Sequence, residues 1–198
     1  MKTILAPARS LAAAALLALA SPAVFAQLPA TTPATSLGAT APAGTPAAKP
    51  LSPSDKKFVK DSGKSIYFEL QLADTAKTGA NSDVTKKFAE QVNTEMHKAW
   101  EALSALAKEK GETIPVELTG GDKGSAERLK KTKGESFDKL FYREFLKEAK
   151  SLDRDFLAAS KSASGDADIK NFATNYLAIV KGHVTDGDKA EKASQKKP

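Results

Sequence analysis

The chain of 198 residues contains no cysteine. This absence excludes disulfide bonds, thiolate metal sites, a cysteine nucleophile and a lipidated cysteine after a signal peptide. Histidine occurs only at His97 and His183, and tryptophan occurs once. With so few imidazoles, the sequence contains no recognisable Ser-His-Asp arrangement, and it has neither a nucleophile elbow nor a phosphate-binding loop. The sequence therefore gives no support for an enzymatic activity.

Long apolar runs are also scarce, and the one near the start has the features of an export signal. Lys2 and Arg9 precede a run of Leu and Ala over 11–20. Val24 and Ala26 occupy the two positions that signal peptidase recognises before a cut after Ala26. The run is shorter than the roughly 20 residues that a membrane-spanning helix requires. We predict a signal peptide over 1–26 and a periplasmic or secreted mature chain without a transmembrane segment. An uncleaved membrane anchor is the alternative.

The next segment, 27–51, lacks the residues that build a hydrophobic core. It consists almost entirely of Ala, Pro, Thr, Gly and Ser, with no aromatic residue and one charge. Such a composition cannot bury enough apolar surface to offset the entropy of ordering. We therefore predict a disordered linker over 27–51.

An excess of charge of one sign is missing as well. Removal of 1–26 takes away two of the 30 basic residues and none of the 24 acidic ones, which leaves a net charge of +4. Both signs are interspersed, so the composition does not indicate a nucleic-acid-binding protein. The short basic clusters at 128–133 and 195–197 are expected to be solvated faces or tails, with lipid or polyanion sites as the alternative.

Helical periodicity dominates the remaining chain, and no segment alternates as a half-buried strand does. Four long helices are predicted, and capping or breaking residues mark their starts at Ser52, Ser82, Ser136 and Asp166. A short extra helix is expected over 125–132, after a flexible connection that contains the glycines of 120–124. The charged segment 189–198 is expected to form a flexible tail.

Two of the long helices carry regular apolar seams, with residues three or four apart. These seams are Phe88, Val92, Met96, Ala99, Leu103, Leu106 and Phe137, Phe141, Phe145, Ala149, Leu152, Phe156. Because each amphipathic helix must cover its apolar stripe, the helices are expected to pack against one another. We therefore predict an all-α domain over 52–188, an antiparallel four-helix bundle with a short extra helix between the second and third long helices.

Five short motifs carry a resemblance to a known family. They lie at 67–70, 84–89, 102–111, 137–141 and 172–177 and together span nearly all of 54–186. Their order and spacing after a signal peptide resemble the exported bacterial domain-of-unknown-function family of ferritin-like four-helix bundles, whose members are described as periplasmic or outer-membrane proteins. The resemblance implies the same fold and the same cell compartment.

The resemblance also implies polar positions within the helices. The family pattern places Asp-His pairs in the second and third long helices and a histidine in the last. In this chain the two pairs fall on Glu95-Met96 and Glu148-Ala149, and only the last position keeps its histidine, His183. Met96 and Ala149 lie on the apolar seams, so we expect them to be ordinary core residues.

Two function hypotheses follow. The first is an exported, non-enzymatic helical protein of the cell envelope without a cofactor, which acts in protein interaction, stress or envelope maintenance. Its partner would be an unknown envelope protein or cell-wall component. The second is a metal-binding bundle that uses His183 with Glu69, Glu95 and Glu148, because mixed nitrogen and oxygen donors suit zinc, iron or manganese. The simpler interpretation of His183 is a lone histidine near a helix end.

Overall fold

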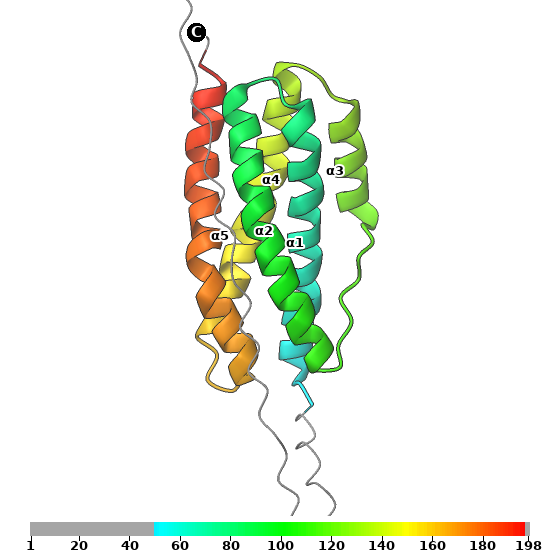
Figure 1. The fold of residues 1–198 in the computed structure, drawn as a ribbon, viewed down its shortest axis with the longest axis vertical. Coiled ribbons are helices and arrows are strands. Elements are labelled where there is room, and N and C mark those ends of the chain that lie inside the picture. The colour runs from blue at the N-terminus through cyan, green and yellow to red at the C-terminus, as the bar shows by residue number, and fades with distance from the viewer. Residues whose placement is uncertain (1–49, 197–198) are drawn as a thin grey trace, which may run out of the picture. The chain divides into compact units, whose positions relative to one another are not determined.

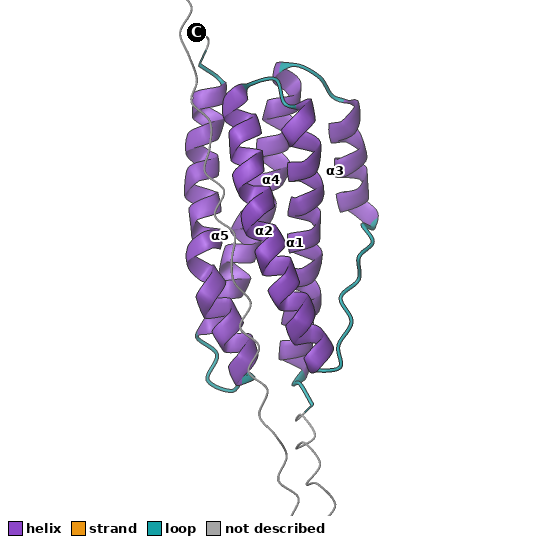
Figure 2. Cartoon of the chain, viewed as in Figure 1, coloured by secondary structure: helices purple, strands orange, loops and turns teal. Residues whose placement is uncertain are grey.

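A computed structural model of the chain describes residues 50–196, and within this range it contains five α-helices and no strand (Figures 1 and 2). The predicted all-α fold is thus confirmed for the described residues. The predicted signal peptide and residues 27–49 of the predicted linker lie outside them. The helices are α1 (Pro53–Gly79), α2 (Asp83–Glu109), α3 (Gly120–Lys131), α4 (Glu135–Ser160) and α5 (Ala167–Ser194).

Three of the four long helices start at the capping residues that the sequence indicates, whereas α4 begins at Glu135, one residue before the predicted Ser136, after Gly134 and without a side-chain cap. The side chains of Ser52, Ser82 and Asp166 each accept hydrogen bonds from backbone N–H groups in the first turn of α1, α2 and α5. These N–H groups have no partner inside their own helix, so the caps stabilise the helix starts. Gly111 follows the end of α2 with a φ of +71°, which glycine adopts without steric cost.

The four long helices pack side by side in a ring (Figure 1). α1 packs against α2, α2 against α5, α5 against α4, and α4 against α1, while α3 lies outside the ring against α1 and α4. The connection 110–119 and α3 return the chain along the length of the domain. As a result α2 and α4 run in the same direction, and α1 and α5 run in the opposite one.

Polar contacts tie the helix ends together. At one end, Lys110 Nζ lies 3.0 Å from a carboxylate oxygen of Asp166 and 2.5 Å from one of Asp168. The same end holds Asp55, whose carboxylate accepts the backbone N–H of Asp166 at 3.2 Å. The end of α2 is thereby joined to the starts of α1 and α5.

The predicted apolar seams meet inside this ring. Phe88 packs against Phe141 and Phe145 with ring centroids 6.4 and 5.2 Å apart. Met96 and Ala149, which we expected in the core, are both completely buried. The periodicity of the sequence therefore identified the buried faces of α2 and α4 correctly.

The short helix differs from the prediction. It begins at Gly120 and contains the glycines that we assigned to a flexible connection. Its residues Ser125, Ala126 and Leu129 are buried where α3 packs on α1 and α4. Burial of this face outweighs the poor helix propensity of glycine, so the prediction of a flexible connection at 120–124 was wrong.

Two boundaries of the predicted domain also differ. Leu51 was expected in the linker, but it is buried in the core cluster. α5 was expected to end near 188, but it continues to Ser194. Gly187 is buried, and a Cβ atom there would lie 2.7 Å from Cδ2 of Leu146, so this part of α5 still packs closely against the core. Within residues 50–196, no helix has the length and apolar character needed to cross a membrane.

Candidate functional site

Each long helix contributes one of the four residues that the sequence nominated. Glu69 comes from α1, Glu95 from α2, Glu148 from α4 and His183 from α5. The structure brings Glu69, Glu95 and His183 together in the core, and we call these three residues the buried triad. Glu148 takes a different partner, Ser65.

The histidine is fixed by the carboxylate on the neighbouring helix. His183 Nε2 lies 2.6 Å from Oε2 of Glu95. An ionised carboxylate only accepts hydrogen bonds, so Nε2 carries the proton and donates to Glu95. His183 is fully buried, whereas the side chain of Glu95 is 32% exposed. The imidazole therefore contacts solvent only through its carboxylate partner.

The other face of the imidazole points toward Glu69. His183 Nδ1 lies 3.9 Å from Oε2 of Glu69, which is too long for a direct hydrogen bond. Both side chains are fully buried, and neither Nδ1 nor either carboxylate oxygen of Glu69 has a hydrogen-bond partner among the described residues. Burial of an unpaired ionised carboxylate is costly. The site therefore favours a charged imidazole, a protonated Glu69, or both.

The pKa values of the two groups move in the directions that this geometry requires. Burial raises the pKa of Glu69 above its ordinary 4.5, and the nearby Glu148 raises it further, while His183 opposes both effects. Burial alone would lower the pKa of His183, but the carboxylates of Glu69 and Glu95 outweigh it, so the pKa lies above the ordinary 6.5. Both groups thus hold a proton to higher pH than they would in the unfolded chain.

The fourth nominated residue is held by α1. The hydroxyl of Ser65 donates to Oε1 of Glu148 at 2.5 Å. Because Glu148 is hydrogen-bonded to Ser65, the four residues that the sequence nominated as metal ligands do not all face one point. Among residues 50–196, no three histidine, aspartate or glutamate side chains are arranged as ligands around one metal position.

His183 does not occupy the place that the simpler interpretation gave it. We expected a lone histidine near a helix end, stabilised by the helix dipole. The residue instead lies inside α5, buried against two carboxylates and the ring of Phe145, whose centroid is 6.0 Å from that of the imidazole. That interpretation was wrong because it placed the end of α5 too early.

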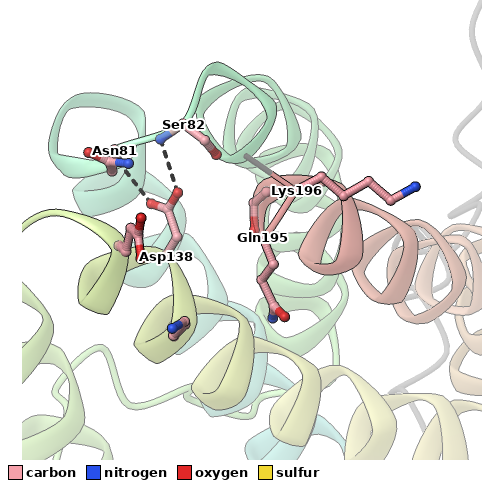
Figure 3. A pocket seen from close by; sticks show the side chains of 8 residues that line it. Asn81, Ser82, Asp138, Gln195 and Lys196 are labelled. Carbon is pink, nitrogen blue, oxygen red and sulfur yellow. Dashed lines mark hydrogen bonds between the residues drawn. The ribbon is translucent and has the colours of Figure 1, made fainter. Parts of the chain in front are cut away.

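A separate pocket of about 320 Å³ lies at the end of the domain where α1 ends and α2 and α4 begin. Figure 3 shows the carboxylate of Asp138 pointing from α4 toward the α1–α2 connection. It accepts the backbone N–H groups of Asn81 at 2.8 Å and Ser82 at 3.0 Å. Gln195 and Lys196 line another side of the pocket. Since Asp138 is already paired with the backbone, its role is to anchor the start of α2.

Neither the role of Asp138 nor the pairing of Glu95 with His183 has a direct signal in the sequence. Both contacts join residues far apart in the chain, and only the packing of the helices brings them together. The single feature that could have suggested the second contact is the position of Glu95 beside the buried seam residue Met96.

A family model described as "Domain of unknown function (DUF4142)" matches residues 40–189. No curated protein matches the chain, and no solved structure does.

Proposed function

The chain belongs to the DUF4142 family, and from its N-terminal sequence and the geometry of its helices we propose that it is an exported, non-enzymatic helical protein of the cell envelope. In this proposal, the buried triad is a structural element that fixes the packing of three helices. The outer helix faces present the protein to its partner, an envelope protein or a cell-wall component.

The helix order supports a ferritin-like four-helix bundle. In such bundles one long crossover connection places the second and third long helices parallel to each other. Here the connection 110–119 and α3 return the chain, and α2 and α4 run in the same direction. Each neighbouring pair in the ring is antiparallel, as in that bundle type.

One observation supports the non-enzymatic assignment: His183 and Glu69, the central residues of the cluster that the sequence nominated, are enclosed in the core, and only Glu95 is partly exposed. His183 and Glu69 have no exposed surface, and the imidazole is already committed to Glu95. A catalytic group must lie within hydrogen-bond reach of a bound substrate. A substrate could reach His183 or Glu69 only if the helices separated.

The unpartnered atoms of the triad favour metal binding as a second candidate. His183 Nδ1 and the carboxylate of Glu69 face each other, and neither has a hydrogen-bond partner within residues 50–196. The hydrogen bond from Nε2 to Glu95 resembles the outer-shell contact that orients metal-binding histidines. However, structural zinc sites use four protein ligands, and here only two unpaired donors face each other. The fit is therefore incomplete, and the structural role is our leading proposal.

Thermal unfolding separates the two candidates. The wild type, His183→Ala and the control His97→Ala, which replaces an exposed histidine on α2, are melted after metal removal and again with zinc, iron or manganese. A structural triad predicts that His183→Ala lowers the melting temperature equally with and without metal. A metal site predicts that metal raises the melting temperature of the wild type and of His97→Ala but not of His183→Ala. The second pattern would replace our leading proposal with the metal candidate.

Export is tested by the mature N-terminus. Expression of the full chain in a bacterial host should give a periplasmic product that starts at Gln27, because the residues up to Ala26 fit the signal-peptidase pattern. N-terminal sequencing of the osmotic-shock fraction checks this. A product that retains residues 11–20 would contradict cleavage and favour a membrane anchor.

A further inference from the structure

The outer face of α4 carries a continuous basic stripe. Its members, all exposed, are Lys139, Arg143, Lys147, Lys150 and Arg154. They are spaced by four, four, three and four residues. At about 100° per residue they fall within an arc of roughly 80°, and at 1.5 Å per residue they extend over about 22 Å. We call this set the α4 stripe.

Two acidic residues of α4, Glu144 and Glu148, bind side chains of neighbouring helices, whereas Glu135 is exposed one turn before Lys139. Glu144 accepts a hydrogen bond from Ser125 of α3 at 3.0 Å, and Glu148 accepts one from Ser65 of α1. Glu144 also pairs with Arg143, and from α5 Asp188 lies 3.4 Å from Lys150. Among the described residues, no ion pair within 4.0 Å involves the other three stripe residues, so the stripe keeps a clear excess of positive charge.

The upper end of the stripe opens into a groove between α3, α4 and α5. This groove, of about 700 Å³, is lined by Arg128, Lys139 and Arg143 and by the hydroxyl-bearing side chains of Thr132 and Ser136. Guanidinium, ammonium and hydroxyl donors together are the groups that bind phosphate oxygens. One acidic residue, Glu191 of α5, also lines the groove.

Another exposed helix face provides a comparison. On α2 the exposed residues mix both signs, as Lys87, Glu90, Lys98 and Glu101 illustrate. Opposite charges there cancel over a short distance, as on an ordinary solvated surface. The α4 stripe therefore does not simply follow from the mildly basic composition of the chain.

We propose that the α4 stripe docks on a membrane surface rich in anionic phospholipid, with one headgroup phosphate entering the adjoining groove. A straight row of cations on a convex helix matches a flat, diffusely charged surface, and each basic residue close to such a surface adds to binding. The stripe contains no aromatic residue on which nucleotide bases could stack, which disfavours a nucleic-acid strand. This proposal adds a partner to the envelope role and uses no residue of the buried triad.

Vesicle co-sedimentation tests the proposal with the full mature chain. The wild type should bind vesicles of phosphatidylglycerol mixed with phosphatidylcholine and should not bind vesicles of phosphatidylcholine alone. The variant Lys139→Gln/Lys147→Gln/Arg154→Gln should bind the anionic vesicles about a hundredfold more weakly. Since none of these three side chains makes an ion pair within the described residues, the variant should keep the wild-type melting temperature.

The matched control is Lys87→Gln/Lys98→Gln/Lys108→Gln, which removes the same charge from the exposed face of α2. If the position of the charges on α4 matters, this control should bind anionic vesicles as tightly as the wild type does. Added salt should weaken vesicle binding by the wild type and by the control to the same extent. Equal losses in the two variants would mean that only net charge acts, and would overturn the assigned surface. Absence of wild-type binding to anionic vesicles, or binding to soluble glycerol phosphate alone, would overturn the membrane as its partner. The melting experiment on His183 is independent of these outcomes.

Discussion

Glu69 and His183 face each other across the core at 3.9 Å, and neither Glu69 nor the Nδ1 atom of His183 has a hydrogen-bond partner among the described residues. They belong to α1 and α5, which are not neighbours in the ring of long helices. The same two helices also meet near one end of the domain, where Phe58 of α1 packs against Phe172 of α5 with ring centroids 6.4 Å apart. Because water does not reach either side chain, their protonation is coupled to the folding of the domain.

The first prediction concerns pH. The raised pKa of His183 stabilises the fold below about pH 6.5, and this contribution is lost as the pH rises through the folded-state pKa. The pKa of Glu69 is also raised, so its contribution to stability is likewise lost as the pH rises above its ordinary pKa of 4.5. We therefore expect the melting temperature to fall as the pH rises above about 6.5. Glu69→Gln should flatten this dependence, whereas Glu101→Gln on the exposed face of α2 should not. If the melting temperature of the wild type, Glu69→Gln and Glu101→Gln depended on pH in the same way, the protonation of Glu69 would not be coupled to folding.

The second prediction concerns Met96, where the family resemblance places a histidine. Its side chain is completely buried on the apolar seam of α2. Met96→Asp should lower the free energy of unfolding by about 3 kcal/mol or more, because it buries a carboxylate without a partner. Met96→Leu keeps volume and polarity and should cost less than about 1.5 kcal/mol. Urea denaturation measures both. A small loss in Met96→Asp would mean that the site still accommodates a polar ligand.

The third prediction concerns Asp138, which is 3% exposed and accepts two backbone N–H groups of the α1–α2 connection. Asp138→Ala leaves both groups without their partner and should cost about 1–3 kcal/mol of stability. Asp138→Asn keeps one acceptor oxygen and should cost less. Asp83→Ala, at a highly exposed acidic position in the first turn of α2, serves as the control. Equal effects of Asp138→Ala and Asp83→Ala would show that only local charge matters.

The fourth prediction compares two glycines inside helices. A Cβ atom at Gly63 would lie 2.3 Å from Cγ2 of Ile114, so Gly63→Ala must displace the connection that covers α1. A Cβ atom at Gly182 would meet nothing within 4 Å. Gly182→Ala should therefore raise stability by about 0.5–1 kcal/mol through helix propensity. Gly63→Ala should lower it by about 1–3 kcal/mol through overpacking. Chemical denaturation gives both values, and a gain in both variants would contradict the close packing of Ile114.

The helices and their buried faces could be predicted because they depend on local chemistry. Ser52, Ser82 and Asp166 are side chains that satisfy the free N–H groups of a first turn, and their positions alone locate three helix starts. Met96 and Ala149 fall on regular seams, and both are buried. These features need no knowledge of which helices are neighbours.

The buried triad could be predicted only in part, because its contacts depend on the packing order. The sequence nominated Glu69, Glu95 and His183, but it could not indicate that Glu95 bonds to the imidazole or that Glu148 turns to Ser65. The start of α3 was missed for a related reason. Its glycines disfavour a helix locally, and contacts with α1 and α4 supply the stabilisation.

The long return of the chain between α2 and α4 has a consequence for the order of folding. It divides the domain into two antiparallel hairpins, α1–α2 and α4–α5, whose contacts are close in sequence and can form early. Glu69 belongs to the first hairpin and His183 to the second, so these two side chains become fully buried only when the hairpins dock. A φ-value near zero for Glu69→Gln would place this desolvation after the transition state. The contacts of the triad would then mainly slow the unfolding of the domain and would have little effect on its folding rate.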